Sequence, residues 1–156
     1  MTKEDSEIKM QQNGSDRNKL FDDLLDLEDR KFLLKHGKVH EATNGEILCH
    51  QNQISDTVFV VLQGEVEVTG VADEGYKVLG NLSAGDLFGE ISALLSIPRI
   101  ATVTANKPSV ILEINKNDFV RLLEQSPDLK NTVYKRLSQR SIQTSILTQP
   151  INLKIN

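Results

Sequence analysis

One short stretch of the chain combines a glycine, a carboxylate and an arginine in an arrangement that suits an anionic ligand. Glu90 follows Gly89 directly and precedes Arg99 by nine residues. Arg99 is the only arginine in the segment 41–114. A buried guanidinium must be paired, and its planar fork matches the oxygens of a phosphate. Gly89 allows close approach of the backbone, and the free N–H groups of a helix that opens near Ile91 favour an anion.

The same residues also have a purely structural interpretation. Glu90 alone could be an exposed carboxylate at the end of a strand, and Arg99 alone could be its salt-bridge partner with no ligand. Taken together at this spacing, an arginine, a carboxylate that accepts hydrogen bonds from hydroxyl groups and a helix start describe a pocket for a phosphorylated sugar.

Short runs rich in β-branched residues surround this stretch, and turn residues separate them. The predicted strands are 46–48, 58–62, 66–68, 76–79, 101–105 and 110–114. Strands at such short and regular spacing predict an antiparallel jelly-roll β-barrel. A short helix at 88–96 interrupts the strands, and a ligand is expected there.

Helical periodicity flanks the strands on both sides. Apolar residues predict two short helices from Leu20 to about Lys38, with a break near Leu27. Asn115 is expected to cap a helix, and Ser126-Pro127 to open a last helix that ends at about Leu147. The fold class is thus mainly β with flanking helices: N-terminal helices, a jelly-roll barrel and a C-terminal helical lid.

The predicted domain spans 19–147, between two polar or short terminal segments. Residues 1–18 offer almost nothing to bury and are expected to be disordered, and 148–156 form a tail. No apolar run is long enough to span a bilayer, and the polar start carries no secretory signal. Cys49 is the only cysteine, which excludes an internal disulfide. These features predict a soluble, cytoplasmic protein.

Charge is segregated along the chain. The segment 41–114 holds ten acidic and three basic residues, a net charge of −7, whereas 115–156 holds seven basic and three acidic residues, a net charge of +4. An acidic body argues against nucleic acid as a partner. The basic tail could meet an acidic protein partner or the barrel's own acidic surface, but a solvated helix is the simpler interpretation.

A jelly-roll barrel could also be a metal-dependent enzyme, but the histidines do not favour that alternative. His36, His40 and His50 are the only histidines, they precede the central strands, and no second cluster completes a ligand set. Cys49 reads as a small core residue, since nothing near it in the sequence indicates an activated nucleophile. Neither catalysis nor a metal is expected.

Residues 88–103 resemble the phosphate-binding cassette of the cyclic nucleotide-binding domain family, which includes protein kinase A regulatory subunits, catabolite activator protein and cyclic-nucleotide-gated channels. The matching residues are Phe88-Gly89-Glu90-Ile91, Leu94 and Pro98-Arg99-Ile100-Ala101-Thr102-Val103. Gly45-Glu46-Ile47-Leu48, Asp56, Phe59 and Gly64-Glu65-Val66-Glu67-Val68 resemble the family's barrel pattern. The resemblance covers about Leu20 to Gln143.

This resemblance implies a role for each matching residue. Arg99 would bind the cyclic phosphate, and Glu90 the ribose 2′-hydroxyl. The base would lie against Leu82 and be covered by the final helix. Backbone groups would complete the cradle at Gly89, Ile91, Ser92 and Ala101.

Ile100 bears on which ligand is preferred. Because isoleucine has no hydroxyl to bond guanine, the resemblance implies cAMP in preference to cGMP, with no further cofactor. The domain would then be a regulatory sensor without an attached output domain, and its helices would rearrange to signal to an unidentified protein partner. The alternative is the same fold with a weak or empty pocket, crowded by Ile100, that acts as a protein–protein interaction module.

Overall fold

The structure, a computed structural model, describes residues 24–148, with side chains described as far as Gln139. The described elements are α3 (Leu27–His36), β1 (Lys38–Ala42), β2 (Ile47–Cys49), β3 (Thr57–Gln63), β4 (Glu65–Ala72), β5 (Gly75–Ser83), β6 (Leu87–Phe88), α4 (Glu90–Leu95), β7 (Thr102–Ala105), β8 (Ser109–Asn115), α5 (Lys116–Gln125) and α6 (Pro127–Thr148). The predicted disordered segment 1–18 lies outside the described residues, as does the predicted tail beyond Thr148.

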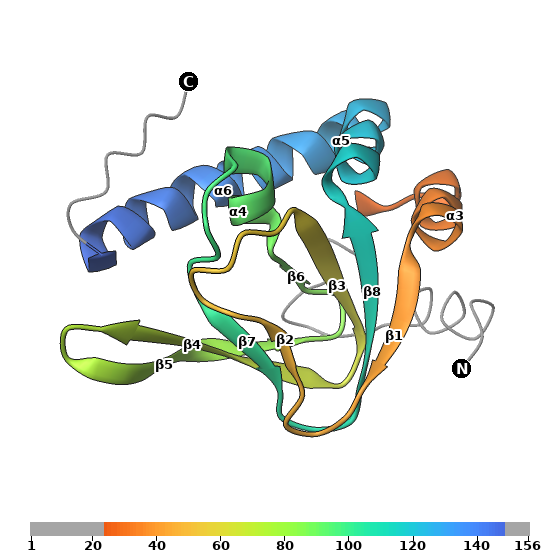
Figure 1. The fold of residues 1–156 in the computed structure, drawn as a ribbon. Coiled ribbons are helices and arrows are strands. Elements are labelled where there is room, and N and C mark those ends of the chain that lie inside the picture. The colour runs from red at the N-terminus through yellow and green to blue at the C-terminus, as the bar shows by residue number, and fades with distance from the viewer. Residues whose placement is uncertain (1–23, 149–156) are drawn as a thin grey trace.

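The strands form two four-stranded antiparallel sheets, with the orders β1-β8-β3-β6 and β2-β7-β4-β5. The two sheets curve around a common interior, and the β4–β5 hairpin projects beyond it (Figure 1). The predicted fold class, a mainly β jelly roll with flanking helices, is confirmed. Its sheets are two separate hydrogen-bonded units and do not close into a single barrel.

The central strand β3 explains why the sequence between 58 and 62 is apolar without interruption. Side chains alternate across a strand, so Phe59 and Val61 pack in the cluster between the sheets. Val58 and Val60 point to the opposite face and pack with buried residues of the helices α3, α5 and α6. The strand β3 is therefore buried on both faces, and the helices pack on its outer side.

Helix caps follow the sequence closely. Asn115 accepts a hydrogen bond from the backbone N–H of Asp118 at the start of α5, as the capping prediction requires. Asp26 and Asp29 form a reciprocal capping box at the start of α3. The cap at Asp26 lies next to the predicted break near Leu27, and the first of the two predicted helices lies almost entirely outside the described residues.

The sequence predicted helical structure to about Lys38, but Lys38 is the first residue of the strand β1, which the sequence interpretation did not identify. The helix α3 ends at His36, because the backbone of Gly37 is extended and its N–H caps the carbonyl oxygen of Leu33. Another residue would not fit at Gly37, since an added Cβ would lie 2.6 Å from the carbonyl oxygen of Leu33 and 2.7 Å from Leu112 Cδ1. The chain then pairs with β8 along Lys38–Ala42. A local helical pattern does not reveal a partner strand that lies about seventy residues later along the chain.

The last helix packs one face on the domain. Leu129 and Val133, four residues apart and so on one face of the helix, are buried in the cluster beneath the helices, while Tyr134 is exposed. The helix α6 runs past α4 and away from the sheets (Figure 1). No helix within the described residues is long and apolar enough to cross a membrane.

Candidate functional site

A cavity of about 500 Å³ lies between the short helix α4, the strand β7 and the β4–β5 hairpin. Every predicted site residue lines it: Leu82, Gly89, Glu90, Ile91, Ser92, Arg99, Ile100 and Ala101. The remaining lining residues are Cys49, Gln51, Val68, Gly70, Val71, Ala72, Glu74, Lys77, Leu79, Gly80, Asn81, Phe88 and Val103. The structure therefore brings together all the residues that the sequence interpretation placed in one site.

Gly89 is the N-cap residue of α4. Its backbone has φ +83°, a left-handed conformation that costs other residues energy. A Cβ at this position would lie 2.8 Å from Arg99 Nη1 and 2.9 Å from the carbonyl oxygen of Thr57. The glycine is thus required both by its conformation and by the arginine that packs against it.

The guanidinium of Arg99 is buried, with 3% of the residue exposed. Its Nη1 donates to the carbonyl oxygen of Gly89 at 2.9 Å and to Ser92 Oγ at 2.7 Å. Its Nη2 donates to the carbonyl oxygen of Thr57 at 2.7 Å and to Ser55 Oγ at 3.1 Å. The ring of Phe59 lies 5.6 Å from the guanidinium carbon, within cation–π range.

These contacts leave one donor of Arg99 for a ligand. A guanidinium has five N–H groups, and the four on Nη1 and Nη2 have the four acceptors above. Arg99 Nε is buried and has no hydrogen-bond partner among the described residues. Ser92 Oγ is a neutral acceptor, which an anionic oxygen can replace with a stronger charge-assisted bond. The residues present therefore fit an anion at this end of the cavity.

Glu90 is the first residue of α4 and is 99% buried. A carboxylate in such a position is costly unless hydrogen bonds compensate it. It lines the same cavity as Arg99, so a carboxyl group and a guanidinium lie at one site. This pair suits a ligand that carries both a phosphate and hydroxyl groups.

Cys49 belongs to the core between the sheets and also lines the cavity. Burial raises the pKa of its thiol, and the positive charge of Arg99 offsets part of that rise. Its sulfur donates to the carbonyl oxygen of Ala101 at 3.8 Å. The expectation that Cys49 is a core residue is confirmed, and its contact with the cavity is additional.

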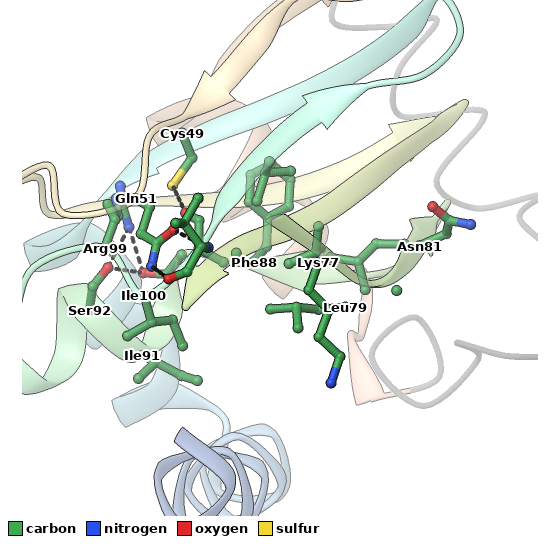
Figure 2. A pocket seen from close by; sticks show the side chains of 18 of the residues that line it. Cys49, Gln51, Lys77, Leu79, Asn81, Phe88, Ile91, Ser92, Arg99 and Ile100 are labelled. Atoms are coloured by element: carbon green, nitrogen blue, oxygen red, sulfur yellow. Dashed lines mark hydrogen bonds between the residues drawn. The ribbon is translucent and has the colours of Figure 1, made fainter. Parts of the chain in front are cut away.

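The far end of the cavity has a different character. Figure 2 shows Arg99 and Ser92 together at one end, and Leu79 and Asn81 of β5 well away from them. Leu79 is 45% exposed, and Lys77 is also exposed. This end is formed by an exposed hairpin rather than by buried polar groups.

The sequence interpretation missed the groups that hold Arg99 from behind. Ser55 and the carbonyl group of Thr57 lie 44 and 42 positions from the arginine in the chain. The hydroxyl of Ser92 was also missed, since only its backbone was expected to matter. Near this loop, only Asp56 and Phe59 matched the family's barrel pattern in the sequence, and neither match indicated a role for Ser55.

The metal-enzyme alternative gains no candidate site. Within the described residues, no group of three or more His, Cys, Asp and Glu side chains is arranged to hold a metal ion. His40 instead hydrogen-bonds Glu46. This hydrogen bond is the main reason why the pKa of the Glu46 carboxyl lies below its usual value.

Fold and cavity together describe a jelly-roll domain with a buried arginine at one end of a cavity. A model of the cyclic nucleotide-binding domain family matches residues 39–126, more than half of the chain. The chain belongs to the cyclic nucleotide-binding domain family, as the cassette resemblance implied.

Individual relatives agree with this assignment. The chain is 31% identical over 128 residues to the cyclic nucleotide-gated channel beta-3 of Canis lupus familiaris, covering 80% of this chain and 15% of the channel. It is 37% identical over 91 residues to the cAMP-dependent protein kinase regulatory subunit of Mycosarcoma maydis, covering 55% of this chain and 17% of that subunit. The chain thus spans less than a fifth of these curated relatives.

The crystal structure of the catabolite activator protein of Thermus thermophilus has the same fold, with a TM-score of 0.68 and 22% identity. The superposition covers 78% of this chain and 58% of that protein.

Proposed function

We propose that this domain is a cAMP sensor: it binds cAMP in preference to cGMP and transmits binding through its helices to a protein partner. The observation that carries the proposal is the buried guanidinium of Arg99 beside α4, with one unsatisfied donor and a replaceable serine acceptor in a cavity of about 500 Å³. That volume lies in the range of small-molecule sites. The cAMP-dependent kinase subunit among the relatives supports the choice of ligand.

Each cavity residue then has a chemical role. Arg99 binds the cyclic phosphate through Nε and through Nη1 once Ser92 gives way. Glu90 accepts a hydrogen bond from the ribose 2′-hydroxyl, a bond to a charged acceptor that contributes about 1.5–3 kcal/mol. The base lies toward Leu82 and the hairpin. The backbone groups at Gly89, Ile91, Ser92 and Ala101 complete the cradle around sugar and phosphate.

Ile100 favours adenine over guanine. It lines the cavity directly after the arginine, and it has no group that can hydrogen-bond a base. A guanine placed there would give up hydrogen bonds to water without replacement, which costs free energy. Adenine has fewer such groups to lose, so a moderate preference for cAMP follows.

The route from ligand to output starts at α4. This helix contacts β3 and α6, and Ser96 at its end accepts a hydrogen bond from Lys116 of α5 at 3.0 Å. A ligand that displaces Ser92 from Arg99 acts on α4 directly, so α5 and α6 receive the change through these contacts. The domain acts as a regulatory, non-catalytic module in the cytoplasm. The final helix is its lid. Among the residues with described side chains, none from α6 lines the cavity.

Calorimetric titration of the purified chain with cAMP and with cGMP tests the proposal. We expect saturable binding of both, with cAMP several-fold tighter. A preference for cGMP would contradict the selectivity alone. Absence of binding for both nucleotides, with no competition between them, would overturn the proposal and favour an interaction module with an empty pocket.

A further inference from the structure

The loop between β2 and β3 contacts the backbone of Arg99. The backbone N–H of Asn52 donates to the carbonyl oxygen of Arg99 at 2.7 Å, and the N–H of Arg99 donates to the carbonyl oxygen of Gln53 at 2.8 Å. Asn52 has φ +71°, which asparagine tolerates better than most residues. The loop thus fixes the arginine's backbone by two hydrogen bonds.

The same loop is itself anchored to the neighbouring strands. The side chain of Gln51 accepts a hydrogen bond from the N–H of Val71 at 2.8 Å and donates to the carbonyl oxygen of Val71 at 3.3 Å. The N–H of Gln51 donates to Thr102 Oγ1 at 2.9 Å. These bonds tie the loop to β4 and β7, so the loop is a fixed support.

Two serines contact the guanidinium, and they lie on different sides of it. Ser92 lines the cavity, whereas Ser55 does not. Ser55 Oγ accepts from Arg99 Nη2 at 3.1 Å and also from the N–H of Thr57 at 3.5 Å. Its oxygen is thereby directed toward the guanidinium by its own loop. A ligand can replace Ser92 without disturbing Ser55.

We propose that Ser55 is a positioning residue, which fixes the plane of the Arg99 guanidinium so that its free edge faces the phosphate. The inference rests on the proposed function and deepens it. Groups that bind a ligand gain affinity when a second set of contacts holds them in the bound geometry beforehand. Without Ser55, Nη2 keeps only the carbonyl oxygen of Thr57. When a ligand also replaces Ser92, only the carbonyl oxygens of Gly89 and Thr57 still hold the guanidinium plane.

The test compares Ser55→Ala with Ser55→Thr, which keeps the hydroxyl, and with Ser109→Ala as a matched control. Ser109 is a buried serine whose hydroxyl bonds the backbone of Glu65 and Lys107, and it does not line the cavity. Affinities are measured for cAMP and for adenosine, which has the same base and ribose but no phosphate.

We expect Ser55→Ala to weaken cAMP about fivefold, which corresponds to about 1 kcal/mol, and to change adenosine less than twofold. Ser55→Thr should stay within twofold of the wild type for both ligands, and Ser109→Ala should lower stability without changing either affinity. Equal losses for cAMP and adenosine in Ser55→Ala, or no loss for cAMP, would overturn the positioning role.

A ligand-free measurement separates this inference from the proposed function. In protein labelled with ¹⁵N-arginine, we expect the Nη2 signal of Arg99, assigned with Arg99→Lys, to show restricted rotation in the wild type and faster rotation in Ser55→Ala. Unchanged rotation would overturn the inference even if cAMP binds. If rotation is faster in Ser55→Ala but the wild type binds no cyclic nucleotide, Ser55 still positions Arg99, and the cAMP proposal is wrong.

Discussion

The two ends of the cavity are built in opposite ways. At the arginine end, Glu90 and Arg99 are 1% and 3% exposed, and the guanidinium has four protein acceptors. At the hairpin end, Leu79 is 45% and Val71 65% exposed. One end is assembled before a ligand arrives, and the other presents apolar surface with few fixed polar groups.

This difference predicts that the two ends contribute unequally to binding. Buried and preorganised polar groups give strong, geometry-dependent recognition of an anion. An exposed apolar hairpin recognises a flat base mainly by the area it covers, which distinguishes poorly between similar bases. Changes at the arginine end should therefore have large effects on any cyclic nucleotide, and changes at the hairpin end small ones.

The largest effect is expected for Gly89→Ala. The new Cβ would enter the space of Arg99 Nη1 and of the Thr57 carbonyl oxygen, and it would strain a backbone at φ +83°. We expect about 1–3 kcal/mol lower stability and at least a tenfold loss of cAMP affinity, measured by denaturation and calorimetry.

Gly75→Ala is the matched control at the hairpin end. Gly75 has φ +99°, and a Cβ there would meet nothing within 4 Å. This variant should lose stability through backbone strain alone, and its cAMP affinity should stay within about twofold of the wild type, about 0.4 kcal/mol. Equal affinity losses in the two variants would remove the distinction between the two ends.

A smaller effect is expected for Leu79→Ala. The side chain lines the cavity but is already half exposed, so a bound base covers only part of it. At about 25 cal/mol per Å² of apolar area, the loss of affinity should be about twofold to threefold, similar for cAMP and cGMP. A tenfold loss in a competition assay would show that the hairpin end is as strongly built as the arginine end.

The smallest expected effect concerns the thiol of Cys49. Burial raises its pKa and Arg99 partly offsets that rise, so Arg99→Leu should raise the pKa further and slow alkylation at pH 8–9, whereas Arg99→Lys should not. Because the folded thiol holds its proton more tightly than the unfolded one, stability should fall as pH rises above about 8.5, the usual thiol pKa. A Cys49→Ala variant that shows the same fall would contradict this origin.

The residues at the arginine end of the cavity were predicted from the sequence, whereas the residues that hold Arg99 in place were not. Glu90, Arg99 and Gly89 lie within eleven residues, so their spacing was visible as a local motif. The strands were predictable because β3 is apolar on both faces. Ser55 was not, since its role depends on a loop that meets Arg99 only after the sheets form. The strand β1 was missed for the same reason: its partner β8 is distant in the chain.

The most direct test of the central claim, that Arg99 recognises the phosphate, is a cycle of two ligands and two proteins. Affinities for cAMP and adenosine are measured in the wild type and in Arg99→Leu, with Arg99→Lys as a variant that keeps the charge. Leucine removes the hydrogen bonds that Arg99 donates to the carbonyl oxygens of Gly89 and Thr57, which lowers stability by about 1–3 kcal/mol, so folding is checked first.

We predict that the wild type binds cAMP at least tenfold more tightly than adenosine, because a charge-assisted bond to phosphate contributes about 1.5–3 kcal/mol. In folded Arg99→Leu the two ligands should bind with nearly equal, weak affinity. If that variant retained the full preference for cAMP over adenosine, the phosphate would be bound elsewhere, and the assignment of Arg99 would be wrong.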